Sequence, residues 1–301
     1  MRTVLTAVAL TLVALRGSAQ APTPLVTGSG NFFSPIVANL EKATAFYRDG
    51  LGLGVMGAPS TGDDNAPLRA MFGLPMARLR WTVARPAGSR NGVEIVEVTS
   101  AGGRLLQRRM DDPGAMTLVY WVPDVAAIAT KLKAHGGTTV ASSTRTSPTG
   151  TSTVLRDPDD HFVELRPGPM RTSPWIRLTV ANVTSTLALY RDRLGIPAVI
   201  DANVTAVEIP GSRLTFEFVG SHSQRHVAGR IQDPGSTRLQ LQVRDLDAAI
   251  RAVVAAGGQV ISTGGVPVEL PAGRGAPIHA AIVRDPNNLF LVLIATTPPA
   301  A

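Results

Sequence analysis

The chain has 301 residues and a hydrophobic content of 44%, which is enough for two globular domains, each with its own core. It contains no cysteine, which excludes disulfides, thiolate catalysis and cysteine-ligated metal centres. The formal net charge is +7, but its one dense basic cluster, Arg104, Arg108 and Arg109, lacks the interleaved aromatic residues typical of nucleic-acid binding. We therefore expect these arginines to form a solvated surface and expect no nucleic-acid partner.

The first residues have the order of a bacterial export signal. Arg2 is followed by an apolar run over residues 3–15 and then by Ser18-Ala19-Gln20-Ala21, which has the small residues of a signal-peptidase site. The apolar run is shorter than the roughly 20 residues that span a bilayer, which disfavours a membrane anchor. We expect cleavage after Ala21, loss of residues 1–21, and a periplasmic or secreted protein that is not attached to the membrane.

The rest of the chain contains an internal repeat, which is visible as three pairs of similar segments in the same order. The pairs are 40–53 with 183–196, 123–137 with 244–258, and 155–165 with 283–293. Proline-rich residues 167–174 separate the two copies. We therefore predict two tandem domains, residues 30–168 and 172–297.

The periodicity within the first copy predicts a strand, a helix and several strands, twice over. Apolar residues at helical spacing predict a helix over 40–51, and Asp124 is a suitable N-cap for a second helix over 124–135. Between these helices, Met71-Phe72-Gly73-Leu74-Pro75 is interpreted as a short helical lid or a dimer contact. In chain order, strands are expected at 31–37, 79–84, 93–98, 116–122, 138–141, 151–156 and 161–165.

These motifs together resemble the vicinal oxygen chelate superfamily, which includes glyoxalases, bleomycin resistance proteins and dioxygenases. They are a helix that ends in Phe-Tyr-Arg-Asp-x-Leu-Gly-Leu, a later helix that ends in Gly-Gly, and a closing Asp-Pro-Asp-Asp-x-Phe-Val-Glu-Leu. The resemblance covers the chain from Asn31 to Ala295. It implies an α+β fold of four βαβββ units in two tandem domains, in which the two units of each domain form one cupped mixed sheet around the active site.

The resemblance also implies where a metal would bind. Enzymes of this family usually hold a divalent metal through His or Glu on the first and last strand of each unit, and the metal acts as a Lewis acid. The matching positions here are Phe32, Glu97, Thr117 and Glu164 in the first domain and Trp175, Glu217, Arg238 and Val292 in the second. Because no histidine occupies any of these positions, no cofactor is predicted, and a divalent metal is kept as an alternative.

Glu97 and Glu164 are the candidate catalytic residues, because they match the family's carboxylates. They would serve as weak metal ligands or as general acid/base groups; the competing interpretation is that they are hydrogen-bonded or solvent-facing strand residues. Phe33, Trp81 and Tyr120 are candidates to line the first cup, with core packing as the alternative.

We therefore expect an exported protein that binds a small organic ligand in one or both cups without the usual metal ligands. One alternative is a metal-dependent glyoxalase, lyase or dioxygenase that uses Glu97 and Glu164, and another is a structural pseudo-enzyme. Ligand binding predicts an apolar cavity with few acids, the enzyme predicts both glutamates in one cavity, and the structural role predicts a filled cup. The protein is expected to be a monomer with pseudo-dimeric domains or a homodimer.

Overall fold

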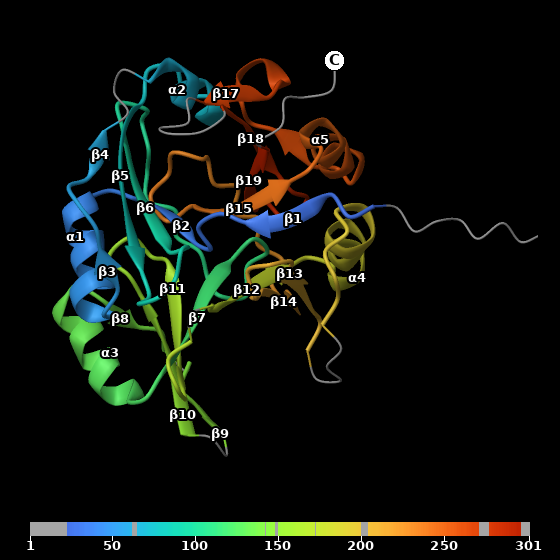
Figure 1. Ribbon diagram of the computed structural model, residues 1–301. Helices are drawn as coiled ribbons and strands as arrows, with labels where there is room; N and C mark the ends of the chain where they lie inside the picture. The colour runs from blue at the N-terminus through green and yellow to red at the C-terminus, as the bar shows by residue number, and fades with distance from the viewer. Residues whose placement is uncertain are drawn as a thin grey trace, which may run out of the picture.

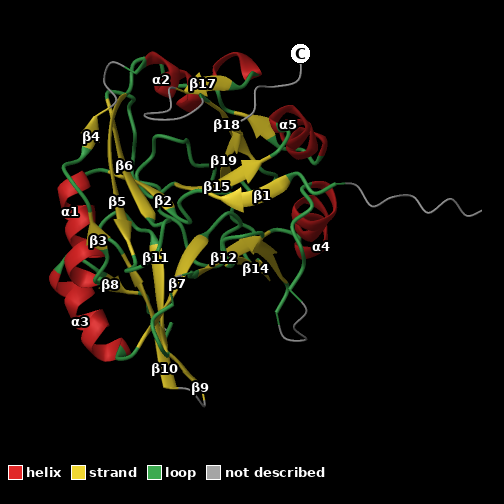
Figure 2. Ribbon diagram, in the orientation of Figure 1, coloured by secondary structure: helices red, strands yellow, loops and turns green. Residues whose placement is uncertain are grey.

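The computed structural model describes residues 23–61, 65–141, 143–147, 150–171, 173–199, 204–270 and 277–295. The predicted signal peptide, residues 1–21, lies outside these ranges, so its cleavage stays a prediction. No helix within the described ranges combines the length and the apolar character needed to cross a bilayer. The described chain forms two mixed sheets with helices packed against them (Figures 1 and 2).

The first sheet combines the first unit of the chain with the last. Its strands are β1 Val26–Ser29, β2 Ser34–Val37, β3 Gly54–Val55, β4 Ser60–Thr61, β5 Arg78–Arg85, β6 Val93–Thr99, β15 Thr237–Val243, β16 Gln259–Val260, β17 Val268–Leu270, β18 Ile278–Arg284 and β19 Phe290–Ala295. Their order is β16-β18-β19-β15-β2-β6-β5-β3, with β1 paired to β15, β4 to β5 and β17 to β18. The two halves of the chain meet where β15 runs antiparallel to β2, with Arg238 opposite Ser34.

The second sheet combines the two middle units. Its strands are β7 Met116–Val122, β8 Thr138–Thr139, β9 Arg145–Ser147, β10 Gly150–Arg156, β11 Phe162–Pro167, β12 Trp175–Val180, β13 Ala206–Ile209 and β14 Leu214–Gly220. Their order is β13-β14-β12-β7-β11-β10-β8, with β9 paired to β10. Here the halves meet through antiparallel β12 and β7, where Trp175 lies opposite Val119.

This topology confirms an α+β fold with cupped mixed sheets, but it corrects the expected pairing of the units. The two units of one copy do not share a sheet: the first and last units of the chain form the first sheet, and the two middle units form the second. The physical reason is that β2 and β7 each use an edge to pair with a strand from the other copy, β15 and β12 respectively. The boundaries 30–168 and 172–297 stay a prediction, and both sheets extend across them.

Each unit contributes one helix, and each of these helices begins at an Asn or Asp whose side chain accepts a backbone hydrogen bond. The four helices are α1 Leu40–Ala45, α3 Val125–Ala134, α4 Val183–Leu187 and α5 Leu246–Ala255, capped by Asn39, Asp124, Asn182 and Asp245. The expected helix over 40–51 is α1 followed by a π-helical turn, Phe46–Gly50, and the second copy repeats this feature at Ala188–Arg193. The extra helix α2, Ala66–Phe72, begins earlier than the predicted lid.

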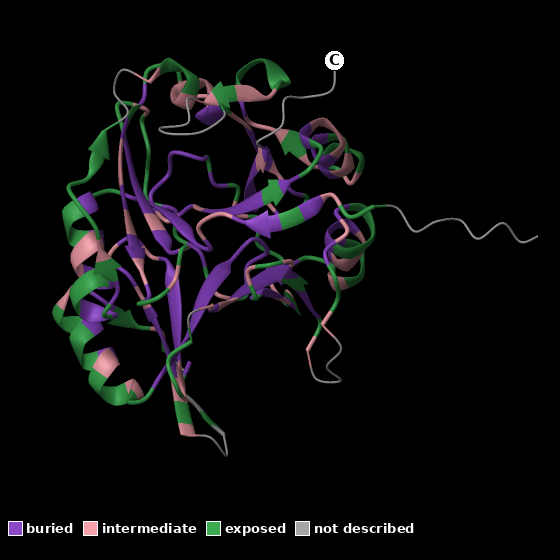
Figure 3. Cartoon of the chain, in the orientation of Figure 1, coloured by how far each residue is buried: buried purple, intermediate pink, exposed green. Residues whose placement is uncertain are grey.

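The two units of each copy remain in contact through their helices. In Figure 1, α1 lies beside α3 and α4 lies beside α5. In the first copy the hydroxyl of buried Tyr47 donates to Asp157 at 3.0 Å, and in the second the hydroxyl of Tyr190 donates to Asp285 at 3.2 Å. Most residues of the long strands are buried, and many of them pack in the core against these helices (Figure 3). Each copy therefore keeps its own helix contacts while it shares both sheets.

One expectation about the surface is corrected. Arg104 and Arg109 are exposed, but Arg108 is buried, and its guanidinium donates to the carbonyls of Gly114 and Val227. Burial lowers the pKa of Arg108 to about 10, although Asp112 and Asp285 oppose the shift. The prediction of a solvated surface is therefore wrong for Arg108. This residue holds the segment between β6 and β7 in place through its two backbone acceptors.

Candidate functional site

The concave face of the first sheet encloses a cavity of about 330 Å³, which we call the first-sheet cavity. Its lining residues come from five strands of this sheet, β5, β6, β15, β18 and β19. Further lining residues come from α2 and β17, which lie at the top of Figure 1. Leu68, Met71 and Phe72 of α2 and Val96 and Val292 of the sheet make it largely apolar. This is the apolar cavity that the ligand-binding hypothesis predicts.

The alternation of side chains along β6 decides which of its residues belong to this cavity. Val96 packs in the cluster that contains the α2 side chains, whereas Val93 and Ile95 pack in the core beneath α1. Glu94, at the same parity as Val96, lines the cavity. Glu97, at the parity of Ile95, lies on the other face of the sheet.

Helix α2 is held over the cavity by specific backbone contacts. The side chain of Asn65 accepts from Leu68 N at 2.9 Å and caps its start, and Gly73 ends it with φ +67°. The hydroxyl of Ser262 donates to the carbonyl of Met71 at 2.7 Å, which ties the end of the helix to the last unit. The sequence segment that predicted a lid thus supplies residues to the cavity, although the helix itself is residues 66–72.

A polar cluster lies within the otherwise apolar cavity. One carboxylate oxygen of Glu94, Oε2, accepts hydrogen bonds from Gln240 Nε2 at 2.6 Å, Arg238 Nη2 at 3.2 Å and Ser34 Oγ at 3.4 Å. The other oxygen, Oε1, accepts none from the residues that the structure describes. The Glu94 side chain is 19% exposed, so a fixed carboxylate presents one open acceptor to a ligand.

Arg238 provides the opposite kind of open group. Its side chain is 2% exposed, and its guanidinium lies 4.7 Å from the centre of the Phe72 ring. Among the described residues its Nε has no hydrogen-bond partner. Burial lowers the pKa of Arg238, and Glu94 opposes that shift; an arginine remains protonated at neutral pH all the same. Because Arg238 lines the cavity, an acceptor oxygen of a ligand would pair with the guanidinium N–H groups that Glu94 does not use.

The residues of this cavity do not fit the divalent metal that the resemblance implies. Arg238 and Val292 occupy two of the implied ligand positions, but a guanidinium offers only donors and a valine offers no ligand atom. Phe32, at a third position, is buried in the core. The amide oxygen of Gln240 already accepts from Asn31 N at 2.8 Å. Throughout the described ranges, no three His, Asp or Glu side chains lie close enough together to hold a metal.

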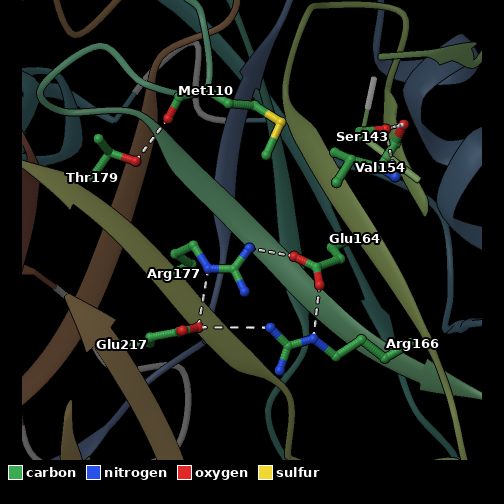
Figure 4. A network of polar contacts seen from close by, with 8 residues as sticks. All are labelled: Met110, Ser143, Val154, Glu164, Arg166, Arg177, Thr179 and Glu217. Carbon is green, nitrogen blue, oxygen red and sulfur yellow. Dashed lines mark hydrogen bonds and ion pairs between the residues drawn. The ribbon is translucent and has the colours of Figure 1, made fainter. Parts of the chain in front are cut away.

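The corresponding face of the second sheet carries a ring of ion pairs instead (Figure 4). Arg177 Nη1 pairs with Glu164, and Arg177 Nε donates to Glu217 at 3.0 Å. Arg166 Nε donates to Glu164 at 2.7 Å, and its Nη2 lies 3.8 Å from Glu217. Burial alone would raise the pKa of Glu164, but Arg177 and Arg166 outweigh it and hold that pKa below its usual value. Glu164 and Glu217 are thus committed to arginines.

The remaining implied positions of the second sheet do not complete a metal site. Thr117 is buried on β7, and Trp175 packs edge-on against Trp121 with ring centres 5.5 Å apart. Arg166 lies 5.8 Å from the Trp175 ring centre and 5.5 Å from that of Trp121. This arrangement resembles the filled cup of the structural hypothesis.

The structure does not bring the two candidate catalytic residues together. Glu164 is on β11 of the second sheet, whereas Glu97 is on β6 of the first, where it accepts from Leu40 N at 3.2 Å and from Arg80 Nη1 at 3.0 Å. Their catalytic role stays a prediction that this geometry does not support. Sequence reasoning missed Glu94, which is on the same strand as Glu97 but on its opposite face.

The aromatic candidates also divide between cavity and core. Trp81 lines the first-sheet cavity, as one of the two interpretations of its sequence position predicted. Phe33 and Tyr120 are buried in the core between the helices and the sheets, which is the packing role.

Comparison with known proteins supports the fold. Residues 31–165 match the family model for the Glyoxalase/Bleomycin resistance protein/Dioxygenase superfamily. The chain is similar to glyoxalase I from Zea mays, with 16% identity, a TM-score of 0.64, and coverage of 90% of this chain and 93% of that one. It is also similar to a protein assigned as a dioxygenase from Bacillus subtilis, with 13% identity, a TM-score of 0.52, and coverage of 92% and 87%. No curated protein sequence matches the chain.

Proposed function

We propose that the chain is a member of the Glyoxalase/Bleomycin resistance protein/Dioxygenase superfamily, whose model matches residues 31–165, and that it binds a small organic molecule in the first-sheet cavity. The observation that carries the proposal is a cavity of about 330 Å³ with apolar walls and one polar cluster. Known small-molecule sites are similar: about 300–1,000 Å³, mostly apolar, with a few placed polar groups.

The apolar walls would hold the body of the ligand. Phe72, Trp81 and Val292 come from three different elements and all line the cavity. Burial of apolar ligand surface against such side chains contributes about 25 cal/mol per Å². The polar cluster of Glu94 and Arg238 would then fix the orientation of the ligand.

The proposal does not require a metal among the ligand contacts. Its support is the donor set of the cavity, in which a guanidinium and a valine stand where the family places metal ligands. Glu94 is the one acidic residue among the described residues that line the cavity. If the bound molecule reacts, Glu94 is the group positioned for acid/base work.

We also propose that the protein acts outside the cytoplasm. The support is the positive end, short apolar run and small-residue site of residues 1–21. Expression of the full chain in a bacterium, followed by N-terminal sequencing of the periplasmic fraction, should give a mature protein that begins at Pro22. A cytoplasmic protein that retains residues 1–21 would contradict export without affecting the ligand site.

Blocking the cavity tests the ligand site. Ala280 is buried on β18 and lines the cavity, so Ala280→Phe should occupy part of the ligand space. Ligand-observed NMR with 2-naphthylacetamide should show binding to the wild type and at least about tenfold weaker binding to this variant. Val254→Phe is the matched control, because Val254 is 46% exposed on α5. Equal binding to all three proteins would place the ligand elsewhere.

A further inference from the structure

Resting on the proposed ligand site, we infer that the first-sheet cavity selects an uncharged ligand that accepts a hydrogen bond from Arg238 and donates one to Glu94. The ligand class is therefore a neutral molecule with an apolar body and a head that holds both an acceptor oxygen and an N–H or O–H group. Primary amides and hydroxyketones have such heads, whereas simple carboxylates and amines do not.

The charges that line the cavity already balance. Glu94 and Arg238 are the two charged side chains among the described lining residues, and they form an ion pair with Oε2 and Nη2 3.2 Å apart. A carboxylate ligand would satisfy Arg238 but place a second negative charge beside Glu94. An ammonium ligand would satisfy Glu94 but place a second positive charge beside Arg238. Like charges repel strongly where water is excluded, so either ion binds less well than a neutral molecule.

The open hydrogen-bonding groups of the cluster are an acceptor on Glu94 and donors on Arg238. Glu94 uses Oε2 for its three described donors and leaves Oε1 open. Arg238 lines the cavity and has one described hydrogen bond, from Nη2 to Glu94, so its guanidinium keeps further N–H groups to donate. Gln240 is committed at both ends, since its Oε1 accepts from Asn31 N and its Nε2 donates to Glu94. Gln240 therefore holds the carboxylate in place, and the ligand head meets Glu94 and Arg238.

The experiment compares three probes of nearly the same shape and different charge. They are 2-phenylacetamide, phenylacetate and 2-phenylethylamine, together with their 2-naphthyl homologues, titrated into the full mature chain at pH 7.5 and followed by ligand-observed NMR. The wild type should bind the amides at least about tenfold more tightly than either ion. Glu94→Gln should shift the preference toward the carboxylates, and Arg238→Met should shift it toward the amines, because each variant leaves one charge without its partner.

Glu97→Gln is the matched control, because this glutamate is on the same strand and is also paired with an arginine, Arg80, but on the opposite face. It should keep the wild-type order of affinities, and thermal melting should show that all variants fold. The two charge variants are independent, so either one tests the inference if the other fails to fold. A wild type that prefers an ion, or folded variants that keep the wild-type order, would overturn the inference. If no probe binds any of the proteins, the proposed ligand site itself fails.

Discussion

Glu94 and Glu97 lie three residues apart on β6, and their side chains leave the strand on opposite faces of the first sheet. Glu94 accepts from Arg238 across the strands at 3.2 Å, and Glu97 accepts from Leu40 N at the start of α1 at 3.2 Å. An odd separation along a strand places two side chains on opposite faces. One strand therefore supplies a ligand-facing carboxylate and a separate carboxylate that anchors a helix.

The role of Glu97 as an anchor predicts a loss of stability and no loss of binding. Glu97→Ala removes the acceptor for Leu40 N and leaves Glu41 as the remaining described carboxylate partner of Arg80. We expect the free energy of unfolding to fall by about 1–3 kcal/mol, as when a buried hydrogen-bonding group loses its partner. Urea denaturation measures this change, and Glu41→Ala, which removes the exposed partner of Arg80, should have little effect. Equal losses in the two variants would contradict the anchoring role.

The ion-pair ring of the second sheet predicts a larger loss. Glu164→Gln leaves the guanidinium of Arg177 buried with Glu217 as its remaining described carboxylate partner. Loss of one member of a buried ion pair typically costs about 3–5 kcal/mol, and the neighbouring ion pairs should reduce this to about 2–4 kcal/mol. The control is the double variant Glu164→Leu with Arg177→Leu, which removes both charges and should lose less than the single variant. If the double variant is less stable than Glu164→Gln, the ion pairs add net stability beyond neutralising each other's buried charge.

The same ring predicts a dependence of stability on acid pH. The pKa of Glu164 lies below its usual 4.5, since Arg177 and Arg166 outweigh the effect of burial. A carboxyl group whose pKa is lowered by folding adds stability that is present above pH 4.5 and is lost as the pH falls through the lowered value. Urea denaturation of the wild type from pH 6 down to pH 3 should therefore show a decline that is shallower in Glu164→Gln. Parallel curves for the two proteins would assign the decline to other carboxylates.

Much of this fold follows from local sequence, because its strongest signals are local. The strand over 116–122 matches β7, and α3 begins after the predicted cap Asp124, since both depend on residues within one element. The pairing of β2 with β15 was not predictable, because Ser34 and Arg238 meet there across 204 positions of the sequence. A strand from the same copy would also bury the apolar face of β2. Glu94 was missed because β6 is apolar on both faces, so alternation along it did not show which glutamate faces the cavity.

His161 predicts a second pH dependence, with the opposite sign. Its Nδ1 lies 2.9 Å from an Asp157 oxygen and its Nε2 lies 3.0 Å from the carbonyl of Ser236, so both ring nitrogens face acceptors. Burial alone would lower the pKa of His161, but Asp157 and Asp159 outweigh it and raise that pKa above its usual 6.5. A base whose pKa is raised by folding adds stability that is complete below pH 6.5 and is lost as the pH rises through the raised value.

The second copy of the repeat supplies the variant that tests this cluster. Leu289 occupies the position of His161 there, and Asp285 still binds Tyr190 and the backbone of the turn. His161→Leu should lower the free energy of unfolding at pH 6 by about 1–3 kcal/mol and flatten its decline toward pH 9. Urea denaturation across this range measures both effects. A decline that persists unchanged in the variant would assign it to another group.

The position of α2 over the cavity depends on a glycine, which gives a test that joins packing to ligand binding. Gly73 ends α2 with φ +67°, and a Cβ added there would lie 2.4 Å from the carbonyl oxygen of Ile261. Gly73→Ala must therefore move α2 or the chain at Ile261, and Met71 and Phe72, which line the cavity, would move with the helix.

Gly57→Ala is the matched control, since Gly57 has φ +75° and no described atom within 4 Å of an added Cβ. Both variants should lose about 1 kcal/mol from left-handed strain, as measured by urea denaturation, and the clash should make the loss larger for Gly73→Ala. Only Gly73→Ala should weaken binding of 2-naphthylacetamide, and equal binding to both variants would mean that α2 does not shape the ligand site.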